Sequence, residues 1–354
     1  MKVRMVIIGG FLGAGKTTLI TRLARDLKDA GVNVGIIMND QADTLVDTQY
    51  AQALGLNSCE VAGGCFCCRF PDLMGQAERL VESSRPQVVM AEPVGSCTDL
   101  LATVVAPLKA FYPERFQVAP LMVMVDAERA IQEGFDRQTL NGYLRRHQLE
   151  EAEVVILSKA DLVGREDIER LKVTIAGINP RAITIVYSAV SSEGYGRVLD
   201  VVRSEEVSEN GPKEIDYAVY AEAEAELGWY NGTLRADFGE GVDSHALGMA
   251  ILGNISSQYP MEDIAHAKVM VTSLSNAMKM SCVRGRVTVD LARGSRVAKG
   301  PGRITVNARV VSDPGRLKGN VRAALEGALP GKRLEFERED CFSPAPPKPF
   351  HRMT

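Results

Sequence analysis

Residues 1–18 read MKVRMVIIGGFLGAGKTT, and this stretch decides the fold of the first half of the chain. Residues 3–8 form a short apolar run, rich in β-branched side chains and bounded by glycine, which predicts a buried strand. The pattern G-x-x-x-x-G-K-[ST] follows at Gly10, Gly15, Lys16 and Thr17. Apolar residues at helical spacing come next. A strand, a glycine-rich loop and a helix in this order are the context of a phosphate-binding loop.

The residue types of this loop suit the phosphates of a nucleoside triphosphate. Glycine lets backbone N–H groups converge on phosphate oxygens, and a helix N-terminus favours negative charge. We expect Lys16 to reach the β- and γ-phosphates and the Thr17 hydroxyl to bind Mg²⁺. The predicted nucleotide contacts are Gly10, Gly13, Ala14, Gly15, Lys16, Thr17 and Thr18. The alternative is a flexible turn before a core helix.

The composition of the 354 residues is that of an ordinary globular protein, with 45% hydrophobic and 24% charged residues. This length allows two domains, each with a sizeable core. The formal net charge of -4 gives no electrostatic reason to expect nucleic acid or an anionic membrane surface as a partner. No apolar run reaches the roughly 18 residues of a membrane span. A strand begins almost at once, so we expect no secretory signal and a cytoplasmic protein.

Strand-like apolar runs alternate with helical patterns over residues 1–205, the expected first domain. The runs are residues 3–8, 34–38, 88–90, 121–125, 154–157 and 183–187. Several are apolar on both faces, which predicts a doubly wound α/β domain with a mostly parallel sheet and its ligand at the carboxyl ends of the strands. Residues 206–214 lose this period and are interpreted as a linker to a second domain over residues 215–354.

The second domain has the pattern of a small α+β sandwich, and a ferredoxin-like arrangement is one form it could take. Alternation predicts a half-buried strand at residues 219–226. Helices are expected from Ser244, as the cap, to about residue 257, and from Asp313 or Pro314 to residue 329. Further strands are expected at residues 267–272, 286–290, 303–311 and 333–337, ahead of a proline-rich tail at residues 344–349.

Two segments at strand ends could complete the nucleotide site. Glu92 opens the sequence E-P-V-G, where an acid can hold Mg²⁺ through water or position the attacking water. Gly95 would let a backbone N–H face the γ-phosphate, although a plain turn is the alternative. In the acid-rich loop of residues 39–47, Asp47 is a candidate catalytic residue in the water network around the metal. Solvated surface acids are the alternative there.

Base recognition is predicted in the sequence S-K-A-D at residues 158–161. The carboxylate of Asp161 can accept both N1–H and N2–H of guanine, and the stem of Lys159 can lie over the base. Ser158 stands where the usual guanine motif has asparagine, which removes an amide contact and leaves the choice between GTP and ATP open. Two residues after the last strand could supply a backbone N–H to the guanine oxygen, namely Ser188 and Ala189. A K-x-D loop without a ligand is the alternative.

Three of the seven cysteines lie within four residues, in the sequence G-G-C-F-C-C at residues 63–68. An odd number of cysteines with such a cluster favours metal binding or redox chemistry over a disulfide framework. If the two glycines bend the chain so that Cys65, Cys67 and Cys68 meet, their thiolates suit Zn²⁺, Co²⁺ or Cu(I). A fourth ligand could be Asp43, water or a residue of a partner molecule. Buried structural cysteines are the alternative.

Together these motifs resemble those of the CobW/HypB/UreG family of metal-linked P-loop GTPases, and the C-x-C-C sequence is most similar to its CobW (cobalamin-synthesis-protein-like) branch. The segments that carry the resemblance are residues 9–18, 63–68, 92–95 and 158–161. The resemblance implies hydrolysis of GTP with Mg²⁺, metal binding at the three clustered cysteines, and delivery of the metal to a client metalloprotein. It also implies slow turnover and a partner or second copy, such as a homodimer, that completes the site.

The chain departs from this family at Ser158 and in its few histidines, because many CobW-like members carry a histidine-rich tract. The metal therefore stays open between Zn²⁺ and Co²⁺, and a corrinoid protein is a client by association only. Two other functions remain. One is an ATP-driven redox activator with an iron–sulfur cluster, a class that carries an extra lysine where this chain has Phe11. The other is a non-catalytic metal buffer or sensor.

Overall fold

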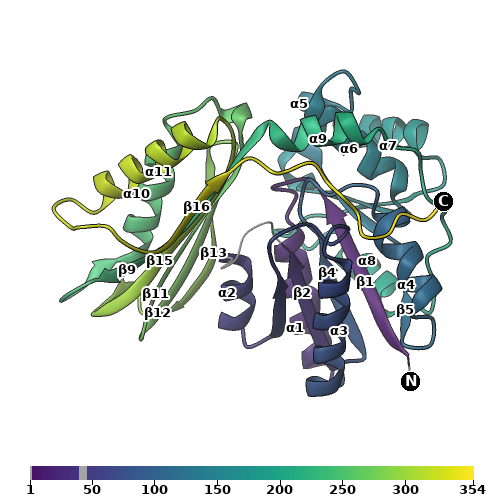
Figure 1. The fold of residues 1–354 in the computed structure, drawn as a ribbon, viewed down its shortest axis with the longest axis horizontal. Coiled ribbons are helices and arrows are strands. Elements are labelled where there is room, and N and C mark those ends of the chain that lie inside the picture. Colours follow the sequence, from purple (N-terminus) through teal and green to yellow (C-terminus); the bar gives the residue numbers. More distant parts are fainter. Residues whose placement is uncertain (1, 40–45) are drawn as a thin grey trace. The chain divides into compact units, whose positions relative to one another are not determined.

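The computed structural model describes residues 2–39 and 46–354, and the chain divides into two compact units (Figure 1). Unit 1 contains the described residues of 1–41, 55–223 and 346–354, and unit 2 contains those of 42–54 and 224–345. Residues 206–214 lack regular secondary structure, yet they belong to unit 1, where Ser208 donates its N–H to the Val118 carbonyl. The division therefore differs from a simple split at a linker over residues 206–214.

The core of unit 1, within the described residues, is a parallel sheet of eight strands. They are β1 (Val3–Gly10), β2 (Val34–Asn39), β3 (Asn57–Val61), β4 (Val88–Glu92), β5 (Phe116–Val118), β6 (Met122–Asp126), β7 (Val154–Ser158) and β8 (Ile183–Val186). Their order is β3-β2-β4-β1-β6-β7-β8, with β5 paired to β1, and each of these pairings is parallel. The expected doubly wound α/β core is thus confirmed.

Helices connect the strands of unit 1. In chain order they are α1 (Lys16–Asp29), α3 (Phe70–Ser84), the π-helical turn η1 (Leu101–Val105), α4 (Ala106–Phe111), α5 (Ala127–Glu133), α6 (Leu140–Glu151), η2 (Ala160–Leu162), α7 (Arg165–Ile178) and α8 (Tyr195–Arg203). Strands β1, β4, β6 and β7 are buried along their whole length, as strands covered on both faces are. Because the carboxyl ends of parallel strands lie along the same edge of the sheet, the residues that follow β1, β4 and β7 meet at that edge.

Unit 2 contains an antiparallel sheet with the order β13-β12-β11-β15-β9-β16. Its strands are β9 (Leu227–Asp237), β11 (Ile264–Ser273), β12 (Asn276–Val283), β13 (Arg286–Gly294), β15 (Pro301–Val311) and β16 (Glu335–Phe342). The two long helices of the unit are α10 (Ser244–Ser256) and α11 (Pro314–Ala328). Two β-α-β motifs, β9-α10-β11 and β15-α11-β16, build this sheet. Their strands lie in the spatial order β16-β9-β15-β11, which is the ferredoxin-like arrangement, and the β12-β13 hairpin extends one edge.

Shorter elements complete unit 2. Strands β10 (Val242–Asp243) and β14 (Val297–Ala298) pair with each other, and η3 (Met261–Asp263) precedes β11. Helix α2 (Val46–Ala53) contacts β11, β12 and β15. The Val46 N–H donates to Asn307 Oδ1 at 3.0 Å, whereas the neighbouring Val306 belongs to the apolar core with α10 and α11. Since side chains alternate along a strand, α2 covers the polar face of this sheet.

Helix α9 (Tyr217–Ala225) occupies the segment where a strand was predicted at residues 219–226, and that prediction was wrong. Alanine and glutamate, which produced the alternation, are strong helix formers. Asp216 also provides a helix cap, because its Oδ1 accepts the N–H groups of Ala218 and Val219. Local propensity and capping therefore outweigh the period-two pattern in this segment.

Other details of unit 2 also differ from expectation. Strands β9 and β12 were not predicted, because β9 contains two glycines and an asparagine and β12 contains an asparagine, an alanine and a lysine, which are depleted in strands. The cap of α10 is Asp243 rather than Ser244, since the Asp243 side chain accepts two N–H groups of the first turn. Asp313 caps α11, as one of the two expected starts.

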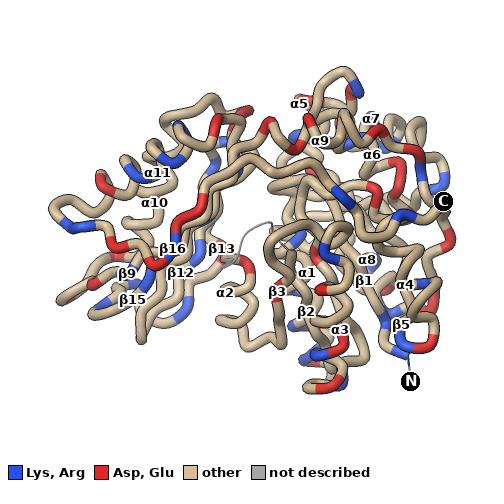
Figure 2. The backbone as a smooth tube through the Cα atoms, viewed as in Figure 1, with Lys and Arg blue, Asp and Glu red and all other residues tan. Residues whose placement is uncertain are grey.

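Charge and apolarity are distributed without extremes. Figure 2 shows acidic and basic residues interspersed along the elements of both units. None of the described helices combines the length and the apolar composition that a membrane span requires.

Candidate functional site

The phosphate-binding loop between β1 and α1, residues 10–17, is named here the phosphate loop. Its backbone has a conformation that glycine adopts most readily. Gly10, Gly13 and Gly15 have φ angles of 127°, 82° and 95°. A Cβ at Gly10 would also lie 2.3 Å from the Met124 carbonyl oxygen, so this position needs glycine for space as well. Lys16 is buried, and its Nζ donates to the Gly10 carbonyl at 2.8 Å. The ammonium therefore lies on the loop that is predicted to bind phosphate.

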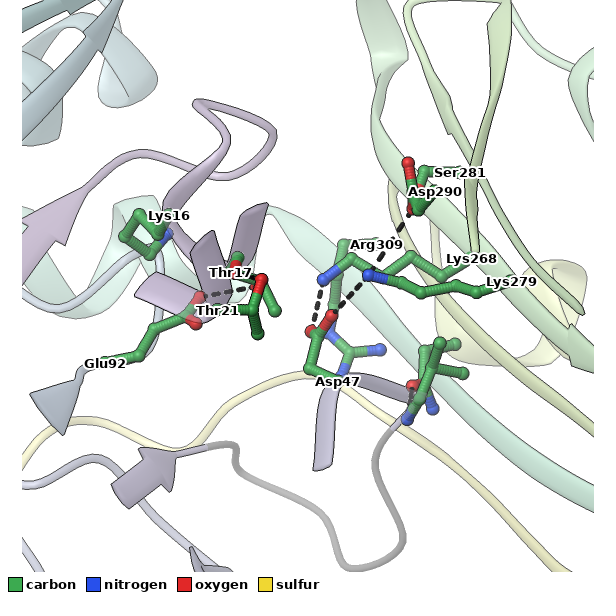
Figure 3. Close-up of polar contacts among 12 residues, drawn as sticks. Lys16, Thr17, Thr21, Asp47, Glu92, Lys268, Lys279, Ser281, Asp290 and Arg309 are labelled. Carbon is green, nitrogen blue, oxygen red and sulfur yellow. Dashed lines mark hydrogen bonds and ion pairs between the residues drawn. The ribbon is translucent and has the colours of Figure 1, made fainter. Parts of the chain in front are cut away.

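Thr17 and Glu92, the two residues predicted to hold Mg²⁺, lie next to each other. The Thr17 hydroxyl donates to Glu92 Oε1 at 3.0 Å (Figure 3). Thr17 is in the first turn of α1 and Glu92 is the last residue of β4, which pairs with β1. Both residues are buried. A hydroxyl and a carboxylate are oxygen ligands of the kind that Mg²⁺ prefers, so the residues present fit this ion.

Residues 92–99 continue from β4 and are named here the connecting segment. Gly95 packs so closely on the phosphate loop that a Cβ would lie 2.9 Å from the Leu12 backbone nitrogen. Gln148 of α6 fixes the segment by donating to the carbonyl oxygens of Gly95 and Cys97, both at 3.0 Å. Glycine at position 95 thus permits a close approach between the two backbones.

The residue in place of the expected asparagine ties β7 to the phosphate loop. Ser158 is buried, and its hydroxyl donates to the Ala14 carbonyl at 2.9 Å. The next residue, Lys159, has a left-handed φ of 56°, and its Nζ pairs with Asp126 Oδ2 at 2.6 Å. Serine therefore has a structural partner within the phosphate loop, and the lysine ammonium is fixed by a carboxylate at the end of β6.

The two loops predicted to recognise the base lie next to each other. The Ala160 N–H donates to the Tyr187 carbonyl at 3.2 Å, which joins the loop after β7 to the loop after β8. Ser188 is fully buried, and its hydroxyl accepts N–H groups from its own loop. Asp161 and Ala189 are exposed. These loops form a common edge, and their recognition of guanine stays a prediction.

The sulfur atoms of the thiol loop, residues 63–68, are gathered together. The Sγ of Cys65 lies 2.6 Å from that of Cys67 and 3.3 Å from that of Cys68, and all three cysteines are free. Asn39, the last residue of β2, fixes this loop. Its Nδ2 donates to the Gly64 carbonyl at 2.7 Å, and its Oδ1 accepts the Phe66 N–H at 2.8 Å. A side chain from β2 therefore holds the bend that brings the sulfurs together.

The thiols of Cys67 and Cys68 resist deprotonation as long as they face only neighbouring thiols. Hydrogen bonding to the neighbouring thiols, together with burial, raises the pKa of Cys67. A hydrogen bond with Cys65 and burial raise the pKa of Cys68 to about 11. A bound metal cation would reverse this effect, because it stabilises the thiolate. The loop thus holds protons that a metal ion would displace.

The C-terminal tail and the connecting segment complete the surroundings of the thiol loop. The Lys348 N–H donates to Cys68 Sγ at 3.2 Å, and the Phe350 N–H donates to the Cys67 carbonyl at 2.8 Å. Cys97, which is buried, has its side chain in hydrogen-bonding contact with that of Cys67. The connecting segment therefore contacts the phosphate loop at its glycine and the thiol loop at its cysteine.

Asp47 has partners other than those the sequence suggested. The residue belongs to α2 in unit 2, where its Oδ1 accepts from Lys279 at 3.0 Å and its Oδ2 accepts from Lys268 (Figure 3). Burial favours a raised pKa for this carboxyl, but the two lysines hold it well below its usual range. Both oxygens are thus engaged by ammonium groups of unit 2, and the expected place of Asp47 in the water network around the metal stays a prediction. Asp43 lies outside the described residues.

Two residues that organise the thiol loop were missed by sequence reasoning. Asn39 was noted only as the start of an acid-rich loop, although its position at the end of a buried strand is a signal for a functional side chain. Cys97 gave no signal, because its partner Cys67 is distant in sequence and only the fold brings them together.

The family model that matches this chain covers its first half. Residues 4–186 match the family model described as CobW/HypB/UreG, nucleotide-binding domain. The chain is 29% identical over 221 residues to a zinc chaperone CobW from Pseudomonas aeruginosa, covering 52% of this chain and 56% of that protein. A zinc chaperone CobW from a Sinorhizobium species is 26% identical over 212 residues, covering 52% and 58%.

The matched regions therefore span a little over half the length of these relatives. Among solved structures, hydrogenase maturation factor HypB from Archaeoglobus fulgidus aligns with 22% identity and a TM-score of 0.40, covering 57% of this chain and 89% of that one.

Proposed function

The chain belongs to the CobW/HypB/UreG family, whose nucleotide-binding domain matches residues 4–186 of its 354 residues, and we propose that it is a GTPase that delivers a transition metal to a client protein. The connecting segment carries this proposal, because it contacts the phosphate loop through Gly95 and the thiol loop through Cys97. A rearrangement at one loop would be transmitted to the other through these few residues, as in other nucleotide switches.

The nucleotide half of the proposal uses the phosphate loop and the edge of the parallel sheet. Lys16 would bind the β- and γ-phosphates, while Thr17 and Glu92 would hold Mg²⁺, which neutralises charge on the phosphates when bound. The loops after β7 and β8, which lie next to each other, support a guanine site. In this site Asp161 would accept N–H groups of the base, and Ser188 and Ala189 would offer a backbone N–H to the guanine oxygen. GTP is therefore the proposed nucleotide.

The metal half of the proposal uses the three sulfurs of the thiol loop, with the metal as cargo. Zn²⁺ is the proposed ion, because three thiolates suit it and the relatives described above are named zinc chaperones. The same donor set accepts Co²⁺, in which case a corrinoid protein would be a suitable client. Asp43 or a residue of a second copy in a homodimer would provide a fourth ligand. Because the thiols must lose their protons, metal binding should weaken as pH falls.

Phosphate release in the presence and absence of Zn²⁺ tests this function. We expect Zn²⁺ to change the rate of GTP hydrolysis or the affinity for GTP in the unmodified protein. Cys67→Ala should remove this response and retain GTP binding, because Cys67 is in the thiol loop and not in the phosphate loop. The control is Cys59→Ala, which removes a thiol on β3 outside the cluster and should leave the response intact.

Two results would contradict the proposal. Hydrolysis that is identical with and without metal would separate the two loops functionally. An absence of phosphate release, with metal still bound, would indicate a non-catalytic metal buffer or sensor instead.

A further inference from the structure

A second group of metal-ligating side chains is buried in unit 1, outside the thiol loop. Asp99 ends the connecting segment, and His147 and Glu151 lie one turn apart on α6. One ligand atom from each of the three lies within 4.8 Å of the other two. The residues are 0%, 3% and 1% exposed, respectively. Neither the nucleotide site nor the thiol loop uses them.

Each of these side chains has one buried polar atom with no hydrogen-bond partner among the residues that the structure describes. The three atoms are Asp99 Oδ1, His147 Nε2 and Glu151 Oε2. Buried polar groups are nearly always paired, so three unpaired acceptors or donors on neighbouring side chains require an explanation. A single bound cation, with its coordination positions filled by these atoms, would satisfy all of them.

The other oxygen of each carboxylate is held in place. Asp99 Oδ2 accepts the Tyr217 hydroxyl at 2.7 Å and Arg352 Nε at 2.9 Å. Glu151 Oε1 accepts the Leu101 N–H at 3.0 Å. Ligating carboxylates are typically oriented by such outer hydrogen bonds. The surroundings therefore fix one oxygen of each group and leave the second one available.

We propose that Asp99, His147 and Glu151 form a second metal site in this chain, which binds a divalent transition metal such as Zn²⁺. One imidazole nitrogen and two carboxylate oxygens suit Zn²⁺ and its neighbours, whereas Mg²⁺ and Ca²⁺ prefer oxygen ligands alone and Cu(I) prefers sulfur. Three protein ligands leave the fourth position of a tetrahedral ion open.

The proposed site and the thiol loop share two stretches of chain. Asp99 follows Cys97 in the connecting segment, and Cys97 contacts Cys67 of the thiol loop. In the C-terminal tail, Arg352 pairs with Asp99, and the Lys348 N–H donates to a thiol of the loop. The second site does not depend on the proposed GTPase function, although its place beside the thiols suits a relay of the same metal.

A shared proton is the competing explanation. Burial, with the neighbouring Asp99 carboxylate adding to it, raises the pKa of Glu151 to about 8, so a proton could take the place of a cation between the two acids. Burial lowers the pKa of His147 to about 4, which keeps the imidazole neutral at pH 7 in either case. Direct metal binding distinguishes the two explanations.

The test is a Co²⁺ titration of the full chain in which Cys65, Cys67 and Cys68 are all replaced by Ser. We expect one equivalent of Co²⁺ to bind with visible d–d absorption and without a thiolate charge-transfer band, because the ligands are nitrogen and oxygen. Competition with Zn²⁺ should remove this spectrum. Adding Zn²⁺ should also raise the unfolding temperature, since a ligand that binds only the folded state stabilises it.

Substitutions in the proposed site test whether its residues bind the Co²⁺ that gives this absorption. In the same background, His147→Ala and Glu151→Gln should each weaken Co²⁺ binding by more than about 100-fold, since loss of an outer partner alone typically costs about 10–100-fold. Glu151→Gln preserves volume and the acceptor of the Leu101 N–H. The matched control is His245→Ala, which removes a histidine of unit 2 and should leave the titration unchanged.

Should the triple Ser variant fold poorly, the unmodified chain provides the second measurement. Zn²⁺ bound per chain should fall by one equivalent in Glu151→Gln, while the thiolate charge-transfer band formed with Co²⁺ stays. The proposal is overturned if the thiol-free chain binds no Co²⁺, if a thiolate band shows that Cys97 has captured the ion, or if His147→Ala and Glu151→Gln leave binding unchanged.

Discussion

The phosphate loop and the thiol loop are neighbours of one connecting segment, but they are built in different ways. The phosphate loop is contiguous in sequence, and its shape comes from glycines with positive φ angles. The thiol loop depends on side chains and backbone from distant parts of the chain, namely Asn39, Cys97, Lys348 and Phe350. Glycines with positive φ angles shape both loops, since Gly63 and Gly64 have φ angles of 77° and 153°. The thiol loop is held by contacts from four distant residues, whereas side-chain hydrogen bonds to the phosphate loop come from Ser158 and Arg129.

This difference indicates which substitutions should alter one loop and leave the other loop unchanged. The phosphate loop tolerates little change at Gly10, because a Cβ there would lie 2.3 Å from the Met124 carbonyl oxygen. Hydrogen bonds from outside the thiol loop can be removed one by one while the cysteines stay in place. The two loops should therefore be separable by substitutions on either side of the connecting segment.

The largest effect is expected from Gly95→Ala. The new Cβ would lie 2.6 Å from Leu12 Cδ2 and 2.9 Å from the Leu12 nitrogen, so the connecting segment and the phosphate loop must move apart. Overpacking of this kind typically costs about 1–3 kcal/mol, which corresponds to roughly 10–100-fold weaker GTP binding if the cost falls on the bound state. Fluorescent-nucleotide titration measures it.

The matched control for this substitution is Gly177→Ala on α7, where no atom of the described residues, beyond the helix's own backbone and the adjacent residues, lies within 4 Å of the added Cβ. It should leave GTP binding unchanged. Equal affinities for Gly95→Ala and the unmodified protein would break the comparison, because the connecting segment would then not constrain the phosphate loop.

A smaller effect, confined to the other loop, is expected from Asn39→Ala. The substitution removes two hydrogen bonds to the backbone of the thiol loop and one to Val61 at the end of β3, so the three sulfurs lose part of their preorganisation. Outer-sphere changes of this type suggest about 10-fold weaker Zn²⁺ binding, with GTP affinity nearly preserved. Competition with a chromogenic chelator measures the metal affinity.

Asn33→Ala serves as its control, because Asn33 is exposed and its side chain, among the described residues, donates only to the backbone carbonyls of Ser84 and Arg85, away from the cysteines. If Asn39→Ala weakened GTP binding more than Zn²⁺ binding, the assignment of this side chain to the thiol loop would be wrong.

The sequence was sufficient for those parts of the site that lie in short contiguous stretches. The phosphate loop, the three cysteines and the E-P-V-G segment could each be recognised because the chemistry needs fixed local spacings. Ser158 could be recognised as unusual, but its bond to the Ala14 carbonyl could not, because that contact depends on where β7 lies beside the loop. The same limit hid Asn39, Cys97 and the group around Glu151.

Asp47 and α9 show two other limits of sequence reasoning. Asp47 follows a strand of unit 1 in sequence, but its helix packs on the sheet of unit 2, where Lys268 and Lys279 neutralise it. The position of a residue after a strand does not say which unit its helix joins. In α9, alternating alanine and glutamate fit two secondary structures, and the cap at Asp216 favoured the helix.

The central claim, that nucleotide and metal bind to one switch, is tested most directly by a reciprocal pair of titrations. The Kd of Zn²⁺ is measured with and without a non-hydrolysable GTP analogue and Mg²⁺, and the Kd of the analogue is measured with and without Zn²⁺. We predict that each ligand changes the affinity of the other by the same factor, about 5-fold or more, as linkage requires. Affinities that stay the same in both directions would contradict the claim.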